Sequence, residues 1–257
     1  MSITTPHSRA ALVTGGAQRI GGAIALALAR AGYAVAIHAN RSRDAAEALR
    51  AEIEGQGGSA AVVVGDLADH HTVLRIVPEA VKAVGALTLL VNNAGIFESD
   101  DIGSLDRDRF DRHFAINLRA PLFLAEAFAI QAPHGADASV VNVVDQRVYK
   151  PTPRFVSYTL TKSALHTATT TLAQALAPNV RVNAVAPGPV LPSPRQDAGA
   201  FARQAATMPL GRGPTPQDVA GAVLYLAGAA GVTGVTLAVD GGQHIAWETP
   251  DSVGIEE

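Results

Sequence analysis

The sequence contains no cysteine, and this absence excludes several chemistries at once. Without thiols the chain forms no disulfide, no zinc–thiolate site and no iron–sulfur cluster, and it has no thiol nucleophile. Charged residues are also scarce, at 17% of 257 residues, and the net charge is −3. Such a balance gives no general attraction to nucleic acid or to an anionic membrane. We therefore expect no metal site and no nucleic-acid partner.

Long apolar runs are missing as well. No run is both long enough and free enough of turn residues to span a bilayer. Residues 1–9 are polar and lack the apolar stretch and cleavage site of a secretion signal. These absences predict a cytoplasmic protein without a membrane partner.

What the sequence does have is a regular alternation of strand-like and helix-like segments. Apolar segments suited to strands occupy residues 10–14, 33–38, 60–64, 87–91, 139–144, 180–185 and 235–239. Helix-like segments occupy residues 20–31, 42–54, 72–84, 105–130 and 157–177. The strands are apolar throughout rather than alternating, as in parallel sheets that helices cover on both faces. We predict an α/β fold with a single Rossmann-type, doubly wound parallel sheet of seven strands and helices on both faces.

No linker or repeat divides the chain, so we predict one domain over residues 1–257. Its one irregular segment is residues 187–216, which contains seven prolines. This segment is too long for an ordinary connection between a strand and a helix, and it predicts a lid over the substrate. The alternative is a surface excursion without a role. Near its end, Thr215 and Pro216 are expected to cap and begin a helix.

Residues 14–21 form a glycine-rich loop between the first strand and the first helix. Glycines let the backbone approach a pyrophosphate closely, and a helix start offers N–H donors and positive potential. Arg19 adds a long cation at the mouth of this loop, where it suits an anion or the edge of a planar ligand. We expect Gly15, Arg19 and Ile20 to contact a dinucleotide.

The end of the second strand indicates which dinucleotide binds. NAD enzymes usually carry an acidic residue here for the ribose 2′-hydroxyl, and this chain has none at that position. Asn40, Arg41 and Ser42 stand there instead, and an arginine beside a hydroxyl at a helix start suits a 2′-phosphate. NADP(H) is therefore favoured over NAD(H). After the third strand, Asp66 and Leu67 are expected near the adenine, although Asp66 equally suits a helix cap.

Tyr158 and Lys162 are four residues apart, so they share one face of the helix predicted over residues 157–177. A tyrosine is a poor acid near neutral pH, and a nearby ammonium is expected to stabilise its phenolate and lower its pKa. Such a pair alone is common. Following a glycine-rich loop of this kind, it predicts proton delivery to a substrate that receives hydride from nicotinamide.

Together these motifs resemble the short-chain dehydrogenase/reductase family over nearly the whole chain. The matching stretches are residues 14–21, 92–95, 117, 158–162, 181–183, 187–188, 233–234 and 240–242. The resemblance implies that Asn117 holds a water linked to Lys162 in a proton relay. It implies a homotetramer with long helices at its interfaces. It also implies that two groups of residues border the cofactor: Asn93, Ala94 and Gly95, and, beside the nicotinamide, Pro187, Gly188 and Val190.

One position departs from the commonest members of that family. They carry a serine thirteen residues before the tyrosine, where this chain has Asp145. Serine donates a hydrogen bond to a carbonyl oxygen, whereas an ionised aspartate only accepts and would repel an oxyanion. Asp145 suits instead a substrate with N–H donors, and it could also orient Tyr158 by accepting its hydroxyl. Two alternatives stay open: a protonated Asp145 that donates, and an Asp145 that faces away from the site.

Arg19 and Asp145 together resemble one branch of the family, the pteridine reductases, as does the stretch 32–42. That resemblance implies a pterin over the nicotinamide, touched by Arg19 and stacked on an aromatic side chain at the position of Phe97. Gly95 stands where many pteridine reductases have a serine, so that hydrogen bond is missing. The hypothesis is NADPH-dependent reduction of a dihydropterin or of dihydrofolate. The alternative is a carbonyl or sugar-type dehydrogenase of the same family that uses NADP(H).

Overall fold

The computed structural model describes residues 9–192 and 197–247. Two predictions therefore fall partly outside the described residues: the absence of a secretion signal concerns residues 1–8, and the predicted lid includes residues 193–196. Within the described part, no helix is long and apolar enough to cross a membrane.

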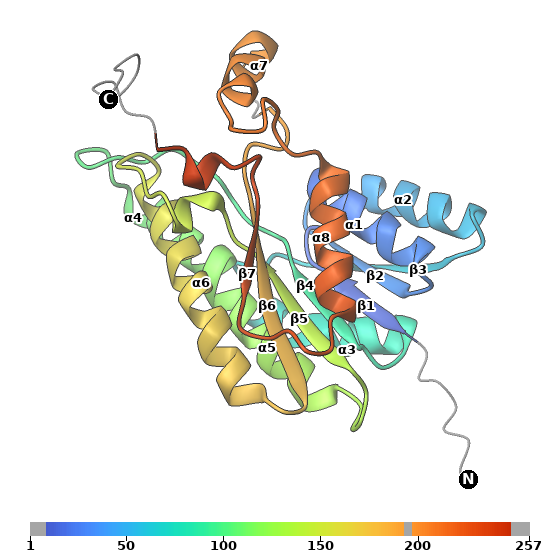
Figure 1. Cartoon of the computed structure of the whole chain (residues 1–257). Helices are drawn as coiled ribbons and strands as arrows, with labels where there is room; N and C mark the ends of the chain where they lie inside the picture. Colours follow the sequence, from blue (N-terminus) through green and yellow to red (C-terminus); the bar gives the residue numbers. More distant parts are fainter. Residues whose placement is uncertain (1–8, 193–196, 248–257) are drawn as a thin grey trace.

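Seven parallel strands form one sheet in the order β3-β2-β1-β4-β5-β6-β7, with helices on both faces (Figure 1). The predicted fold class is thus confirmed. The strands are β1 (Ala10–Val13), β2 (Ala34–Ala39), β3 (Ser59–Val64), β4 (Leu89–Asn92), β5 (Ala138–Val143), β6 (Val180–Pro187) and β7 (Thr236–Val239). The order reverses between β1 and β4, and at such a switch point the strand ends diverge and leave room for a ligand.

Two sets of helices cover the sheet. One face carries α1 (Arg19–Arg30), α2 (Arg43–Gly55) and α8 (Pro216–Gly228), and the other carries α3 (His70–Val84), α5 (Ala120–Gln131) and α6 (Val156–Leu176). The strand β1 contributes to both layers: Ala11 and Val13 pack against the first set of helices, while Ala10 and Leu12 pack against the second. All four side chains are fully buried, which explains why this strand is apolar at every position.

The long helix predicted over residues 105–130 is wrong in its continuity. The structure has α4 (Arg107–Phe114), a π-helical turn (Ala115–Arg119) and then α5. Pro121 accounts for the break, because it has no N–H to donate to the carbonyl of Asn117 and its ring crowds the preceding turn. The irregular turn places Asn117 in the interior, fully buried.

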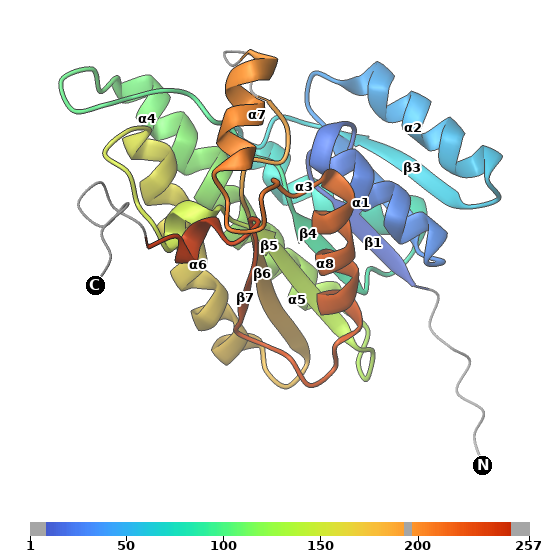
Figure 2. The same ribbon diagram turned by 45° about the horizontal axis from the view of Figure 1, so that its top comes forward.

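The proline-rich segment contains a helix that the sequence interpretation missed, α7 (Ala198–Ala206), capped by the side chain of Asp197. In Figures 1 and 2, α7 stands beyond the carboxyl end of the sheet, apart from the two helical layers. The helix start predicted at Thr215 and Pro216 is confirmed, because the Thr215 and Asp218 side chains form a capping box around the first turn of α8.

Candidate active site

A cleft of about 1010 Å³ opens where the carboxyl ends of the strands meet. Most of the residues predicted for the site line it: Gly15, Arg19, Ile20, Asn40, Arg41, Ser42, Asp66, Leu67, Asn93, Ala94, Gly95, Phe97, Asp145, Tyr158, Gly188 and Val190. Three predicted residues do not line the cleft, namely Asn117, Lys162 and Pro187, and all three are buried. The sequence therefore identified residues that the fold brings to one place.

The glycine-rich loop packs tightly against the residues that follow β4. Gly15 has a φ of +59°, and a side chain on it would press on the Ala94 backbone at 3.0 Å. A side chain on Gly21 would overlap the Gly15 carbonyl and the Asn93 amide. Gln18, the residue before α1, forms no side-chain cap, so the first N–H groups of α1 are left for a ligand.

His38 is a functional residue that sequence reasoning missed. It lies at the end of β2, 2% exposed, and joins two loops that border the cleft. Its Nδ1 accepts the Gly15 N–H at 3.2 Å, and its Nε2 donates to the Gly65 carbonyl at 3.1 Å. Burial lowers the pKa of His38 to about 4, so the ring is neutral and carries its proton on Nε2. No local pattern around residue 38 signals this bridge.

Arg19 begins α1 with a left-handed φ of 54°. Its Nη2 donates to the carbonyl of Pro192 at 3.2 Å, which connects the glycine-rich loop to the proline-rich segment. From that segment Gly188, Pro189, Val190 and Leu191 line the cleft, and Gln204 of α7 lines it as well. Contact between Arg19 and an anion or a flat ring stays a prediction.

The end of β2 leads directly into α2. Ser42 occupies the cap position of α2, but its hydroxyl makes no capping hydrogen bond. Asn40 and Arg41 are exposed on the cleft wall, and Arg41 has no ion pair among the described residues. The helix-cap interpretation of Asp66 is wrong, because Asp69 caps α3 and Asp66 instead accepts the Ala68 N–H at 2.9 Å.

Asp145 faces α6, the helix that carries Tyr158. The alternative that Asp145 faces away from the site is therefore wrong. Its Oδ2 accepts the Tyr158 hydroxyl at 2.9 Å, and its Oδ1 accepts the Arg147 backbone N–H at 2.9 Å. Burial, followed by the charge of Asp145, raises the pKa of Tyr158 well above its ordinary value. Tyr158 is therefore held in its protonated form, with its proton directed at Asp145.

Lys162 does not lower the pKa of Tyr158 as expected. Its Nζ donates to the Val143 carbonyl at 2.7 Å and lies 5.8 Å from the centre of the Tyr158 ring. Burial lowers the pKa of Lys162 to about 8. The ammonium is thus bound to the backbone beneath the cleft rather than to the phenol.

Asn117 uses its side chain to fix the loop after β4. Its Oδ1 accepts the Ile96 N–H at 2.9 Å, and its Nδ2 donates to the Ile96 carbonyl at 3.0 Å and to Thr161 Oγ1 at 3.3 Å. A side chain on Gly95 would approach Asn117 Oδ1 at 3.3 Å and Lys162 Nζ at 3.6 Å. A side chain here would therefore lie against both Asn117 and Lys162.

Phe97 belongs to an aromatic cluster that the sequence revealed only in part. It stacks on Phe155 with ring centres 4.3 Å apart and meets the Tyr158 ring edge to face at 4.7 Å. The guanidinium carbon of Arg147 lies 5.0 Å from the Phe97 ring centre. Neither Phe155 nor Arg147 was predicted, because their positions depend on irregular backbone: Phe155 has a left-handed φ of 58°.

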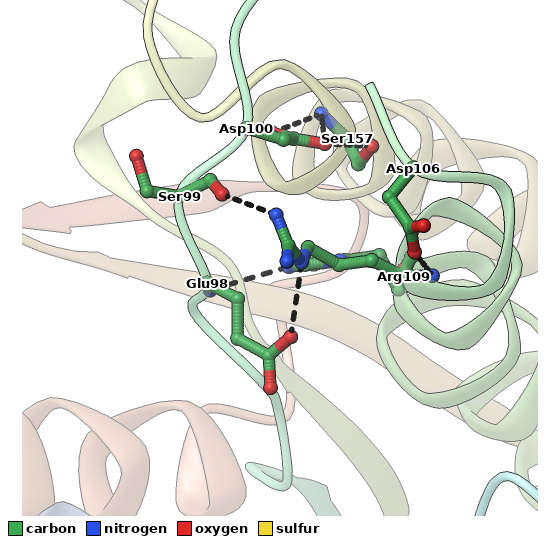
Figure 3. Close-up of polar contacts among 7 residues, drawn as sticks. Glu98, Ser99, Asp100, Asp106, Arg109 and Ser157 are labelled. Atoms are coloured by element: carbon green, nitrogen blue, oxygen red, sulfur yellow. Dashed lines mark hydrogen bonds and ion pairs between the residues drawn. The ribbon is translucent and has the colours of Figure 1, made fainter. Parts of the chain in front are cut away.

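A polar network anchors the loop that carries Phe97, as Figure 3 shows. Arg109 of α4 donates to the Ser99 carbonyl at 2.9 Å, and its Nε lies 3.7 Å from Glu98. Asp100 is 2% exposed and accepts both the N–H, at 3.1 Å, and the hydroxyl of Ser157 at the start of α6. The hydrogen bonds between Asp100 and Ser157 join the loop of Phe97 to the start of α6. They thereby fix the position of Phe97 relative to Tyr158.

The segment after β7 begins with a short 3-10 turn, Gln243–Ile245. Gln243 lines the cleft, whereas the side chains of Ile245 and Trp247 are 64% and 74% exposed. The Ala246 carbonyl accepts the Lys150 ammonium at 3.0 Å. The start of this segment thus borders the site, and its apolar end faces outward.

Known proteins resemble this chain over nearly its full length. A family model described as enoyl-(acyl carrier protein) reductase matches residues 15–244. L-rhamnose 1-dehydrogenase (NAD(P)(+)) from a Sphingomonas species is 35% identical, over 93% of this chain and 97% of that protein. FolM alternative dihydrofolate reductase 1 from Brucella canis, solved in complex with NADP, is 50% identical with a TM-score of 0.92, over 95% of this chain and 97% of that chain. A short-chain dehydrogenase/reductase from Serratia marcescens is 36% identical with a TM-score of 0.85, over 91% and 97% of the two chains.

Proposed function

This chain belongs to the short-chain dehydrogenase/reductase family of oxidoreductases, and we propose that it uses NADPH to reduce a dihydropterin or dihydrofolate. The observation that carries the proposal is the carboxylate of Asp145, which accepts the Tyr158 hydroxyl at 2.9 Å. This acceptor stands where the commonest members of the family have a serine donor.

The cleft fits a 2′-phosphorylated dinucleotide. Gly15 and Gly21 let the loop pack closely against Asn93 and Ala94 at the cleft. The uncapped start of α1 offers N–H donors to a pyrophosphate there. Arg41 and the free hydroxyl of Ser42 suit the 2′-phosphate, and no acidic residue stands between them and β2. The NADP complex of the Brucella protein supports the same cofactor. Bound NADPH would supply the hydride.

Tyr158 is the proposed proton donor. Burial and the charge of Asp145 raise its pKa, so the hydroxyl is protonated at neutral pH and gives up its proton only if a nearby positive charge offsets Asp145. We propose that Lys162 and a water held by Asn117 return a proton to Tyr158 after each turnover. The Asn117 side chain is committed to Ile96 and Thr161, so its backbone carbonyl, which receives no hydrogen bond from Pro121, is the group suited to hold that water.

The substrate is proposed from two contacts. Asp145 offers acceptor oxygens to a ring that carries N–H donors. Its negative charge would repel the oxyanion that forms when a carbonyl is reduced. Phe97 provides an aromatic surface beside Tyr158, with Arg19 and the segment around Gly188 and Val190 closing the far side of the cleft. The printed name of the Brucella protein, a dihydrofolate reductase, supports this class. A sugar substrate is the second candidate, because L-rhamnose 1-dehydrogenase is also a relative.

We propose further that the chain forms a homotetramer in the cytoplasm. We also propose that the described parts of the predicted lid, residues 187–192 and 197–216, close over the substrate. Exposed apolar side chains on α5 and α6 support the assembly, with Phe123 37% and Leu160 49% exposed, and Trp247 adds a third such group. Light scattering on the purified protein would give four times the mass of the chain if this is correct.

Replacement of Asp145 by serine tests the proposed function. Asp145→Ser should lower kcat/KM for a dihydropterin severely, because the acceptor for the substrate N–H groups and for Tyr158 is lost. Asp145→Asn is the matched variant, since it keeps the size of the side chain and removes only the charge. An Asp145→Ser variant that gains only ketone reduction, in a protein without pterin turnover, would support a carbonyl reductase instead.

A further inference from the structure

We infer that Arg147 balances the charge of Asp145 when Tyr158 gives up its proton, and thereby allows an aspartate to function at this position. Arg147 would be a positioning residue that acts through Asp145, rather than a group that reacts. The inference rests on the proposed role of Tyr158 as proton donor, and it does not depend on which substrate takes the proton.

The three side chains form a short chain of polar contacts. Arg147 lies two residues after Asp145, in the 3-10 turn Gln146–Val148, and its backbone N–H donates to Asp145 Oδ1 at 2.9 Å. Its Nη1 lies 3.7 Å from Asp145 Oδ2. That same oxygen accepts the Tyr158 hydroxyl at 2.9 Å. One carboxylate oxygen is therefore shared between a phenol and a guanidinium.

Aromatic rings hold the guanidinium of Arg147 in place. Its central carbon lies 5.0 Å from the ring centre of Phe97, 5.3 Å from that of Phe155 and 5.8 Å from that of Tyr158. Its side chain is 22% exposed and that of Asp145 is 18% exposed. A cation so surrounded is screened less by solvent than a surface arginine is, and the ring faces attract it.

Proton transfer changes the charges at this point. When the Tyr158 O–H bond breaks and the proton bonds to the substrate, a phenolate is left beside a carboxylate, where a hydrogen bond had joined the two groups. Two negative charges at such a separation oppose each other strongly. Asp145 and Arg147 are the charged side chains that act on the Tyr158 hydroxyl, and Lys162 Nζ lies 5.8 Å from the centre of the Tyr158 ring.

Arg147 is the cation placed to offset this repulsion. Lys162 approaches from within α6, but its Nζ donates to the Val143 carbonyl at 2.7 Å. Arg147 instead contacts the carboxylate oxygen that the phenol uses. In members of the family that carry serine at this position no such cation is required, because serine brings no charge. Arg147 and Asp145 should therefore act as a unit.

A double-mutant cycle tests this coupling. Arg147→Met keeps the length and apolar contacts of the side chain and removes its charge. It should lower kcat on the order of 100-fold, the scale seen when a group that stabilises developing charge is lost, and leave the KM for NADPH unchanged. Arg147→Lys should recover most of the loss, since it restores the charge. In an Asp145→Asn background, the same Arg147→Met change should cost little.

Two results would overturn the inference. One is an equal loss on Arg147→Met in the wild type and in the Asp145→Asn background, and the other is an Arg147→Lys variant as slow as Arg147→Met. Either would mean that Arg147 does not act by balancing the charge of Asp145. Arg107→Met, at an exposed arginine of α4 away from the cleft, is the control and should leave kcat unchanged. Thermal unfolding of each variant checks that the fold is intact.

The cycle also separates this inference from the proposed substrate. The measurements use whichever of dihydropterin, dihydrofolate or a ketone the wild-type protein reduces with NADPH. If the wild type reduced ketones and no pterin, the proposed substrate would be wrong, and the same cycle on the ketone would still decide the role of Arg147.

Discussion

His38 makes the stability of this protein depend on acid pH in a way that can be calculated. The ring is neutral in the folded state, where it accepts from Gly15 and donates to Gly65. Burial lowers its pKa from 6.5 to about 4. One pKa unit corresponds to about 1.4 kcal/mol, so this lowering amounts to about 3 kcal/mol.

The sign follows from which state binds the proton. Between pH 6.5 and about 4, the unfolded chain has protonated His38 while the folded protein has not. Protonation therefore favours unfolding in this window, and the free energy of unfolding falls as the pH is lowered through it. Above pH 6.5 neither state binds the proton, and His38 makes no difference to the pH dependence.

Urea unfolding at several pH values between 4 and 7 measures the effect. The wild-type protein should lose about 3 kcal/mol more over this window than His38→Gln does. His38→Gln should be less stable at pH 7 by about 1 to 3 kcal/mol, because one buried partner loses its hydrogen bond. His134→Gln, at an exposed histidine, is the control and should behave as the wild type. Equal pH dependence in the wild type and in His38→Gln would refute the reasoning.

Further predictions concern the cofactor and the proton relay. Gly21→Ala should abolish NADPH binding in a fluorescence titration, because its new methyl group overlaps the phosphate loop, whereas Gly22→Ala, with its nearest neighbour at 3.6 Å, should bind normally. Arg41→Ala should raise the KM for NADPH by roughly 30-fold, because losing a charged hydrogen bond costs about 2 kcal/mol. The KM for NADH should stay unchanged in this variant. Arg43 does not line the cleft, so Arg43→Ala should change neither KM. The profile of kcat against pH should fall above about pH 8, where Lys162 loses its proton, and this limb should move to higher pH in Lys162→Arg. An unchanged limb in that variant would remove Lys162 from the relay.

The fold could be predicted from the sequence because its strands and helices differ in local pattern. Runs 139–144 and 180–185 are rich in valine, and even their polar residues, Ser139, Asn142, Arg181 and Asn183, are buried. Strands buried in this way belong to a sheet that helices cover on both faces. The break between α4 and α5 was missed although Pro121 marks it, since the apolar pattern continues across the proline. The prediction followed the apolar pattern and did not take into account that Pro121 cannot donate a backbone hydrogen bond within a helix.

The candidate site could be predicted where a motif carries its own geometry. Tyr158 and Lys162 lie one turn apart on a helix. A hydrogen bond from Tyr158 to Asp145 was one of the alternatives that the sequence left open, and the structure contains it. His38 and Arg147 could not be found in this way. Their roles arise from partners far away in the sequence, or from a turn whose shape the sequence does not signal.

Consumption of NADPH by the wild-type protein tests the central claim most directly. The loss of NADPH absorbance would be followed with dihydrobiopterin, dihydromonapterin, dihydrofolate and several simple ketones. For L-rhamnose-type sugars, the gain of NADPH absorbance from NADP⁺ would be followed instead. The account predicts turnover with at least one dihydropterin or with dihydrofolate, at a kcat/KM well above that for any ketone or sugar. Turnover of ketones or sugars with no consumption of NADPH on any pterin or folate would contradict it.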